Sequence, residues 1–362
     1  MIRLIRPYIS FEEVEADFRR MFAEGIFTRG RHVNSFREEF ATYTGARHVH
    51  FTTSATTALS TCMKLLAIGP GDEVVVSDFS FPATANVVED VGARPVFADV
   101  SLDTFNMLPE ALAARISPRT RAVIAVDTFG SPTGIHEIAR ICRERGLPLI
   151  EDAACAVGSS ERGVPCGRIA DLTCFSFHPR KLLTTGEGGA ITTDRSEWST
   201  WLDVKLNHGA RGAQGYAQDF VDFGYNYRLS EPQAAMGRAQ LRKLDDIVAS
   251  RNVVRSACIE RLASVGFVPQ KTGDDVTFNV QSLVFRVPVG VDRDALIAAL
   301  REDDIETTLG TYCLSGTTYY RNRYGEVQPN AEHLQRETIT LPCHAGVDID
   351  RVCDAIRSHV RS

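Results

Sequence analysis

Short apolar runs alternate with segments of helical pattern through the first part of the chain, from about Asn34 to Glu151. In order they are VHFTT and ATTALSTCMKLL within 49–66, EVVVS at 73–77 and a helix opening near residue 82, RAVIAVD and GIHEIARICRERG within 121–146, and PLIED at 148–152. Strands that are joined through a helix pair in parallel, and the helices then cover both faces of the sheet. The pattern predicts an α/β fold with a mostly parallel central sheet flanked by helices, and ligands of such sheets collect at the carboxyl ends of the strands.

The last third of the chain is organised differently. Ser-Glu-Pro-Gln at 230–233 has the pattern of a capping box with proline in the first turn, so it predicts the start of a long helix through AAMGRAQLRKLDDIVASRNVV. After about Ala249 the pattern becomes a helix, an apolar strand in VQSLVFRVPV, a helix in RDALIAALRED and a terminal helix from Asp348. We expect a large domain at 1–249 and a smaller C-terminal α/β domain at 250–362, bridged by the long helix.

The composition is that of a globular protein of roughly two domains. The chain has 362 residues, of which 44% are hydrophobic and 24% charged, and about 150 residues per domain is usual. Lys and Arg number 40 and Asp and Glu number 46, so the net charge is −6, which argues against a broad nucleic-acid-binding surface. Any anionic ligand must therefore be held by local positive groups.

Neither the N-terminal segment nor the cysteine pattern indicates export. The N-terminus reaches Glu12 and Glu13 before any long apolar stretch, unlike a signal peptide, and no apolar run approaches the ~20 residues of a membrane span. The nine cysteines include no C-x-x-C pair, which argues against a structural zinc site and a disulfide framework. We expect a cytoplasmic protein with no membrane segment and no metal site, whose cysteines are mostly small buried residues.

A carboxylate stands at the end of the apolar run PLIED. Asp152 is expected at the carboxyl end of a central strand, where a side chain can face a ligand. A carboxylate paired with a pyridinium nitrogen keeps that nitrogen protonated, as an electron-sink cofactor requires. Alone, the motif is weak, because an Asp at a strand end is more often a helix cap or a turn residue.

A lysine stands between two further apolar strands in LTCFSFHPRKLLTTGEGGAITT, at 172–193. The first strand delivers Ser176, and Lys181 follows in a turn. Desolvation of an amine in such a place lowers its pKa, and a lysine so activated can form a Schiff base. The glycines of TTGEGG would let the backbone approach a ligand closely, although a tight connection with positive φ also explains them.

A helix opens directly after a strand in HFTTSATTALS, at Ser54, Ala55 and Thr56. Free amides and hydroxyls at a helix N-terminus bind phosphate without a positive side chain. An ordinary N-cap is the alternative interpretation. This helix start, Asp152 and Lys181 all lie where the carboxyl end of a strand meets a loop, which favours one common site.

The order of these elements resembles that of the DegT/StrS-type nucleotide-sugar aminotransferases, which are fold type I enzymes that use pyridoxal 5′-phosphate (PLP). The resemblance runs from about residue 8 to the C-terminus. Its densest motifs are SAT at 54–56, FSFPATANVV at 79–88, EDAA at 151–154, FSFHPRK at 175–181, TTGEGG at 184–189, NHG at 207–209 and GYNYRLSEPQAA at 224–235. Seven motifs in the same order as in the family argue strongly against chance.

The resemblance implies a catalytic pair and a ring contact. Lys181 would form the Schiff base with PLP and act as the base, Asp152 would pair with the pyridine nitrogen, and Phe81 would stack on the ring. The implied reaction moves an amino group from an amino acid, L-glutamate by resemblance, to a nucleotide-linked keto-sugar. Pyridoxamine 5′-phosphate (PMP) would carry the amino group between the two stages.

The resemblance also implies a phosphate site that two subunits share. Ala55 and Thr56 would supply amide and hydroxyl contacts, joined by Ser176. Asn226, in GYNYR, would reach the phosphate from the neighbouring subunit, so the active unit would be a homodimer. The alternative for Asn226 is a turn residue whose side chain bonds its own backbone.

Four positions depart from the family pattern. Ala55 replaces a more common glycine, which keeps the amide and adds a methyl group. Cys155 replaces a common glutamine that contacts the ring oxygen of the cofactor, and a thiol is a weaker donor. Leu182 and Tyr312 stand where many relatives have asparagine and histidine. These departures leave the acceptor open, including the choice between a sugar and an aminocyclitol precursor.

Two other functions fit the same fold. One is a PLP- or PMP-dependent sugar dehydratase, but the relatives with that activity have histidine in place of the Schiff-base lysine, and Lys181 disfavours it. The other is a non-catalytic regulatory or scaffold homologue. Such a protein would have no need of Lys181, Asp152, Thr56 and Ser176 together.

Overall fold

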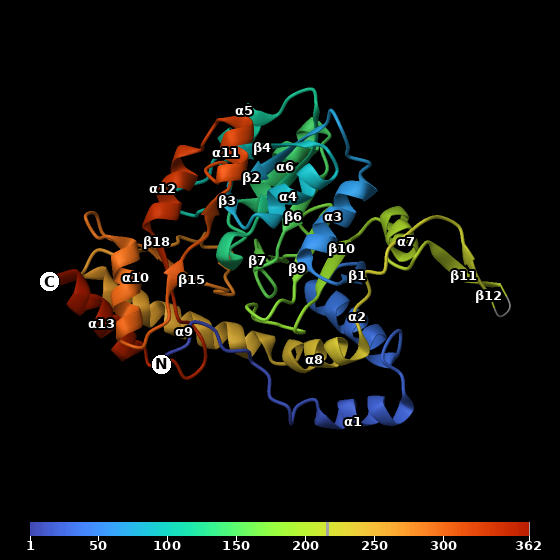
Figure 1. Ribbon diagram of the computed structural model, residues 1–362, viewed down its shortest axis with the longest axis horizontal. Coiled ribbons are helices and arrows are strands. Elements are labelled where there is room, and N and C mark those ends of the chain that lie inside the picture. The colour runs from blue at the N-terminus through green and yellow to red at the C-terminus, as the bar shows by residue number, and fades with distance from the viewer. Residues whose placement is uncertain (215–216, 362) are drawn as a thin grey trace.

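A seven-stranded sheet forms the centre of the larger domain (Figure 1). The structure is a computed structural model and describes residues 1–214 and 217–361. From edge to edge the strands are β1 (His48–Thr52), β10 (Gly189–Thr193), β9 (Leu172–Ser176), β6 (Leu149–Asp152), β5 (Thr120–Val126), β2 (Glu73–Ser77) and β4 (Arg94–Ala98). β10 is antiparallel to both of its neighbours and the other pairs are parallel. The mostly parallel sheet expected from the sequence is confirmed.

Helices cover both faces of this sheet because its strands are apolar on both sides. Val74 and Val76 of β2 pack in one core cluster and Val75 packs in another, as the alternation of side chains along a strand requires. The first face carries α3 (Ala55–Leu65), α4 (Ala83–Asp90) and α7 (Ser196–Lys205), and the second carries α2 (Arg31–Thr44), α5 (Pro109–Arg115), α6 (Ile135–Arg145) and α8 (Glu231–Leu241).

A second, antiparallel sheet organises the C-terminal part of the chain. Its order is β13 (Val268–Pro269), β15 (Leu283–Arg286), β18 (Thr338–Leu341) and β16 (Thr308–Leu309). It shares one core cluster with α10 (Arg293–Glu302), α13 (Ile349–Arg361) and the end of α9 (Leu244–Ala263). Ile2 pairs with Ile305, so the first residues of the chain lie against this part. The proposed division at 249/250 falls inside α9.

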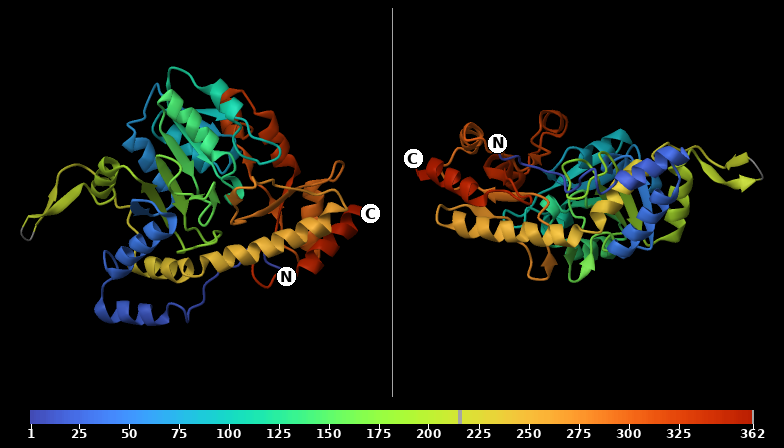
Figure 2. Two further views of the ribbon diagram at one scale, coloured as in Figure 1. Left: turned by 180° about the vertical axis from the view of Figure 1, so that it is seen from behind. Right: turned by 90° about the horizontal axis from the view of Figure 1, so that it is seen from below.

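The helix that begins at the capping box is broken once. Ser230 and Gln233 form the expected box, and α8 follows it. The backbone leaves helical geometry at Lys243, with φ −118°, and its N–H bonds to the carbonyl of Gln240 three residues before. The long helix is therefore two helices, α8 and α9, which run in line beneath both domains (Figures 1 and 2).

Short pairings join the two parts at the loops of the central sheet. β3 (Phe79–Ser80) pairs with β17 (Tyr312–Cys313), and β7 (Ser160–Glu161) pairs with β8 (Val164–Pro165) and β14 (Val276–Thr277). The remaining elements are α1 (Glu15–Glu24), η1 (Thr128–Gly130), β11 (Ala210–Gln214), β12 (Ala217–Phe220), α11 (Thr318–Tyr324) and α12 (Pro329–Glu337). β11 and β12 project from the body of the molecule (Figures 1 and 2). None of the described helices has the length and apolar character needed to cross a membrane.

Candidate active site

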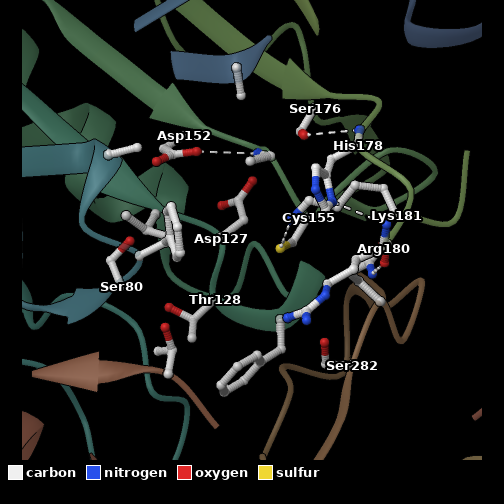
Figure 3. A pocket seen from close by; sticks show the side chains of 18 of the residues that line it. Ser80, Asp127, Thr128, Asp152, Cys155, Ser176, His178, Arg180, Lys181 and Ser282 are labelled. Atoms are coloured by element: carbon white, nitrogen blue, oxygen red, sulfur yellow. Dashed lines mark hydrogen bonds between the residues drawn. The ribbon is translucent and has the colours of Figure 1, made fainter. Parts of the chain in front are cut away.

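A cavity of about 560 Å³ lies at the carboxyl ends of the parallel strands. Its walls come from the loops after β1, β2, β5, β6 and β9, from the N-terminal residues 4–5, and from four segments of the C-terminal part, at 251, 281–282, 308–311 and 340–341. Seven of the eight site residues predicted from the sequence line it: Ala55, Thr56, Phe81, Asp152, Cys155, Ser176 and Lys181. Figure 3 shows Asp152, Cys155, Ser176 and Lys181 around this space.

The start of α3 forms one end of the cavity. Ser54 Oγ accepts from the N–H of Thr57, and Thr57 Oγ1 accepts from the N–H of Ser54, so the cap is complete within itself. The N–H groups of Ala55 and Thr56 remain for a ligand, because the first turn of a helix has no intrahelical acceptors. A Cβ on Gly189 would lie 2.5 Å from the carbonyl carbon of Ser54. Only glycine therefore lets β10 pass so close to this helix start.

Asp152 is the last residue of β6 and is buried. Its Oδ2 accepts a 2.8 Å hydrogen bond from Thr84 Oγ1, and its Oδ1 accepts a 3.3 Å bond from the N–H of Ala154. Burial raises the pKa of this carboxyl, while these bonds and the charge of Lys181 oppose the rise. A buried carboxylate with only neutral direct donors is stabilised by a cation, which a protonated ring nitrogen would supply.

Lys181 lies in the turn after β9 and faces the loop after β6. Its Nζ lies 3.1 Å from Cys155 Sγ (Figure 3). The backbone N–H of Lys181 bonds to the carbonyl of His178 at 2.8 Å, which closes the turn. The amine is therefore inside the cavity, beside the residue that stands three positions after Asp152.

Phe81 follows β3 and stands at the rim. Its side chain is 65% exposed although it lines the cavity. Pairing of Ser80 with Tyr312 fixes the strand just before it. An aromatic ring exposed beside a cavity can stack on a planar ligand.

The family model for the DegT/DnrJ/EryC1/StrS aminotransferase family matches residues 9–357. The chain belongs to this family. GDP-perosamine synthase of Caulobacter vibrioides is 33% identical over 98% of this chain and 97% of that protein. The solved aminotransferase TlmJ of Streptoalloteichus hindustanus is 32% identical, with a TM-score of 0.94 over 100% of this chain and 99% of the other. The chain is thus a PLP-dependent sugar aminotransferase with the fold type I architecture.

The residues of this DegT/DnrJ/EryC1/StrS aminotransferase suit PLP. The Streptococcus pneumoniae protein Spr1654, 25% identical, has been solved in PLP and PMP forms, and the structures match with TM-scores of 0.93 and 0.94 over at least 99% of this chain and 98% of the other. In the present structure the amides of α3 suit a phosphate, the buried Asp152 suits a ring N–H, and Lys181 presents an amine in the same cavity.

Asn226, the eighth predicted residue, does not line this cavity. It is exposed and pairs with Asn207 in an isolated bridge. Nearby lies a second cavity of about 470 Å³ whose lining includes Arg29, Arg37, Arg211 and Arg228. Asn226 therefore lies on a different surface of the chain from this cavity.

Two further buried carboxyl groups, those of Asp127 and Glu151, lie close together near Asp152. Asp127 lines the cavity and Glu151 lies beside it, and neither Asp127 Oδ2 nor Glu151 Oε1 has a hydrogen-bond partner among the described atoms. With Cys166 Sγ they form a set whose ligand atoms lie within 4.8 Å of one another. Burial raises the pKa of both carboxyls, and the charge of Glu151 raises that of Asp127 further. A proton shared by the two carboxyls accounts for both unpaired oxygens.

Sequence reasoning missed three residues of this site. Asp127 ends the run RAVIAVD just as Asp152 ends PLIED, so the same strand-end argument could have found it. Thr84 stands inside the motif FSFPATANVV, and its hydroxyl at the start of a helix next to the aromatic Phe81 could have indicated a polar residue of the site. Gln281 has no local signal, because its partners lie 99 and 101 residues before it.

Proposed function

We propose that this aminotransferase takes the amino group of L-glutamate and delivers it to the keto group of a nucleotide-linked sugar. The family supports amino transfer to sugars, and GDP-perosamine synthase is by its name a relative whose product is nucleotide-linked. The observation that carries the proposal is the convergence of the α3 helix start, Asp152 and Lys181 on one cavity. Its volume of about 560 Å³ lies within the ~300–1,000 Å³ typical of small-molecule sites.

Lys181 is the proposed catalytic residue. Its Nζ would hold the cofactor covalently until the donor amine displaces it, and the freed amine would then move a proton to and from the donor Cα. Asp152 Oδ would keep the ring nitrogen protonated. PLP supplies the electron sink for this proton transfer when it is bound.

The other cavity residues would bind and orient the cofactor. The amides of Ala55 and Thr56 and the hydroxyl of Ser176 would hold its phosphate, and Phe81 would cover the ring. Cys155 lies 3.1 Å from Lys181 Nζ, so its thiol would contact the cofactor close to the lysine. A thiol donates weakly, and we propose that this contact is weaker than that of the glutamine in relatives.

We also propose a homodimer with shared sites. Arg29 and Arg228 both donate to Asn207 Oδ1, and Asn207 pairs with Asn226. Burial and the charge of Arg29 lower the pKa of Arg228, as expected where two guanidinium groups converge. Such a cationic pocket suits an anion brought by a second subunit, either its cofactor phosphate or its nucleotide substrate.

Exposed apolar side chains near this pocket support the same proposal. Phe27, Phe220 and Phe223 are 41%, 61% and 69% exposed, and Phe27 precedes Thr28, which pairs with Ser230 just after GYNYR. Phe220 pairs with Ala210, which lines the pocket, and large exposed apolar side chains beside a pocket can mark an interaction surface. The free thiols of all nine cysteines support the proposed cytoplasmic location, where disulfides are rare.

Spectroscopy and a Lys181→Ala variant test this function. The purified wild-type chain with PLP should be yellow, should lose that colour when L-glutamate is added, and should regain it with a nucleotide-linked keto-sugar. Lys181→Ala should bind PLP or PMP without a borohydride-reducible adduct and should show no turnover. Release of a sugar hydroxyl as water, without amination, would favour the dehydratase, and failure to bind PLP would favour a non-catalytic homologue.

A further inference from the structure

One carboxamide bonds to the backbone on both sides of Lys181. Gln281 Nε2 donates to the carbonyl of Arg180 at 2.7 Å, and Gln281 Oε1 accepts from the N–H of Leu182 at 2.9 Å. Gln281 is 9% exposed and precedes β15 in the C-terminal part of the chain. Figure 3 shows Arg180 and Lys181 beside the segment that carries Ser282. The peptide that presents the lysine is thus held from outside its own loop.

The segment that carries Gln281 is itself held rigidly. Val280 has φ 53° and is fully buried, a left-handed conformation that is strained for a β-branched residue and persists only where its surroundings enforce it. Arg251 enforces it, because Nε donates to the carbonyl of Val280 at 2.7 Å and Nη2 donates to that of Gln281 at 2.9 Å. The N–H of Gln281 also bonds to Asn279 Oδ1 at 2.9 Å.

The same segment holds the loop that faces Lys181. Asn279 Nδ2 donates to the carbonyls of Cys155 and Val157, both at 2.8 Å. Cys155 Sγ is the atom that Lys181 Nζ contacts. Residues 279–281 therefore fix the lysine and its nearest neighbour relative to each other.

We propose that Gln281 is a positioning residue for Lys181. By fixing the carbonyl before the lysine and the N–H after it, Gln281 keeps the Cα of Lys181 in place while its amine leaves the cofactor and returns in each half of the reaction. The inference rests on the proposed role of Lys181. Displacement of a reacting group by about 1 Å costs on the order of 10²-fold in rate, so the loss of both bonds should affect covalent capture of PLP before it affects binding of the cofactor.

Gln240 provides a matched control. Its carboxamide bonds both the N–H and the carbonyl of Thr184 in the same loop, at 3.0 and 2.5 Å. Gln281→Leu and Gln240→Leu each remove both hydrogen bonds of one carboxamide to the loop backbone, with little change in side-chain volume. If Gln281 merely stabilises the loop, the two variants should behave alike.

Two measurements separate positioning from general damage. The first is the rate at which the cofactor-free chain captures PLP on Lys181, followed by borohydride trapping and peptide mass. The second is the affinity for PMP, which has no aldehyde to bond to the lysine. Gln281→Leu should slow capture at least about tenfold with PMP affinity little changed. Gln240→Leu should leave the capture rate close to that of the wild type.

A Gln281→Glu variant tests the inference by a second route if the leucine variant does not fold. Ionised, the carboxylate faces the carbonyl of Arg180 and repels it; protonated, it donates to the same atom. The rate at which the Gln281→Glu chain captures PLP, divided by the wild-type rate, should therefore rise as pH falls towards the pKa of the new carboxyl. Burial raises that pKa above the usual ~4.3. Gln240→Glu should show no such recovery.

Equal capture rates in the two leucine variants, or a Gln281→Glu to wild-type ratio that does not change with pH, would overturn the positioning role. Absence of capture in the wild type itself would contradict the proposed role of Lys181 and overturn both proposals. Slow capture confined to the Gln281 variants, with PMP affinity retained, would support them.

Discussion

Thr84 Oγ1 donates to Asp152 Oδ2 at 2.8 Å and so joins the first turn of α4 to the end of β6. Ser80 Oγ lies 2.8 Å from the same Thr84 hydroxyl. A short chain of hydrogen bonds thus connects the strand that precedes Phe81 with the carboxylate proposed to hold the ring nitrogen. Thr84 of α4 therefore contacts both the Ser80 segment, which leads into the cavity wall at Phe81, and the buried carboxyl group of Asp152.

Thr84→Val should slow the half-reaction with L-glutamate by about tenfold, since removal of a hydrogen bond to a charged group costs about 1.5–3 kcal/mol. The bond lowers the pKa of Asp152, and without it the carboxyl would hold the ring nitrogen protonated less well. Single-turnover absorbance at the cofactor band measures the rate. Thr84→Ser keeps the hydroxyl and should stay near the wild type, so equal slowing in the two variants would contradict the assignment.

Asp152→Asn should leave the fold intact and slow the same half-reaction by on the order of 10²-fold or more, because the amide cannot carry the charge that stabilises a protonated ring nitrogen. Circular dichroism and borohydride trapping on Lys181 serve as controls, and both should match the wild type. A single-turnover rate within a few-fold of the wild type would remove Asp152 from the proposed role.

Asp127→Asn should flatten the pH dependence of stability. The folded chain raises the pKa of Asp127 well above its usual value, mainly through burial, so the native state keeps a proton that the unfolded state loses above about pH 4. The free energy of unfolding then falls as pH rises from there towards the folded-state pKa. Asparagine keeps a donor for Glu151 and has no proton to lose.

Urea unfolding across neutral and alkaline pH measures this effect. Asp274→Asn is the control for net charge, because Asp274 is exposed. The wild type and the control should lose stability with rising pH more steeply than Asp127→Asn. Parallel curves for all three chains would show that the two buried carboxyls do not share a proton.

Mixing two inactive chains tests the shared site. If Asn226 acts on the neighbouring subunit, subunit exchange between Lys181→Ala and Asn226→Ala chains rebuilds one complete site per hybrid dimer, and activity should appear at no more than half of the wild-type value per dimer. A mixture of Lys181→Ala with Asp152→Asn should show no more activity than the Asp152→Asn chain alone, because Lys181 and Asp152 line the same cavity of one chain. No recovery after demonstrated exchange, or a chain that sediments as a monomer, would refute the shared site.

The sequence predicts those parts of the site whose signal is local. The runs that end at Asp152 and Ser176 are strands, and SAT is a capped helix start, because apolar pattern and capping chemistry act over a few residues. The antiparallel direction of β10 could not be predicted from the sequence, because an apolar run can pair with its neighbours in either direction. The break at Lys243 is also missed, because the helical pattern continues through it.

The hydrogen bonds that hold the loops around the site join residues far apart in the sequence, so no local pattern predicts them. Gln281 reaches Leu182 across 99 residues and Asn279 reaches Cys155 across 124. A polar residue before a strand looks like any other loop residue in the sequence. Its significance follows from the tertiary fold, which brings the Lys181 loop and the Cys155 loop to one strained segment.

The hydrogen bonds from residues 279–281 to the loops that carry Cys155 and Lys181 have a consequence for the synthesis of the chain. The loops of one chain that are proposed to hold its own PLP are all synthesised by residue 189, whereas Asn279 and Gln281 are synthesised about ninety residues later. Domains fold as units and N-terminal parts fold first during synthesis, so the central sheet can form while the lysine loop is still unsupported. We expect a nascent chain stopped before residue 279 to have a folded sheet and to capture the cofactor slowly, so that fast capture reports synthesis beyond residue 281.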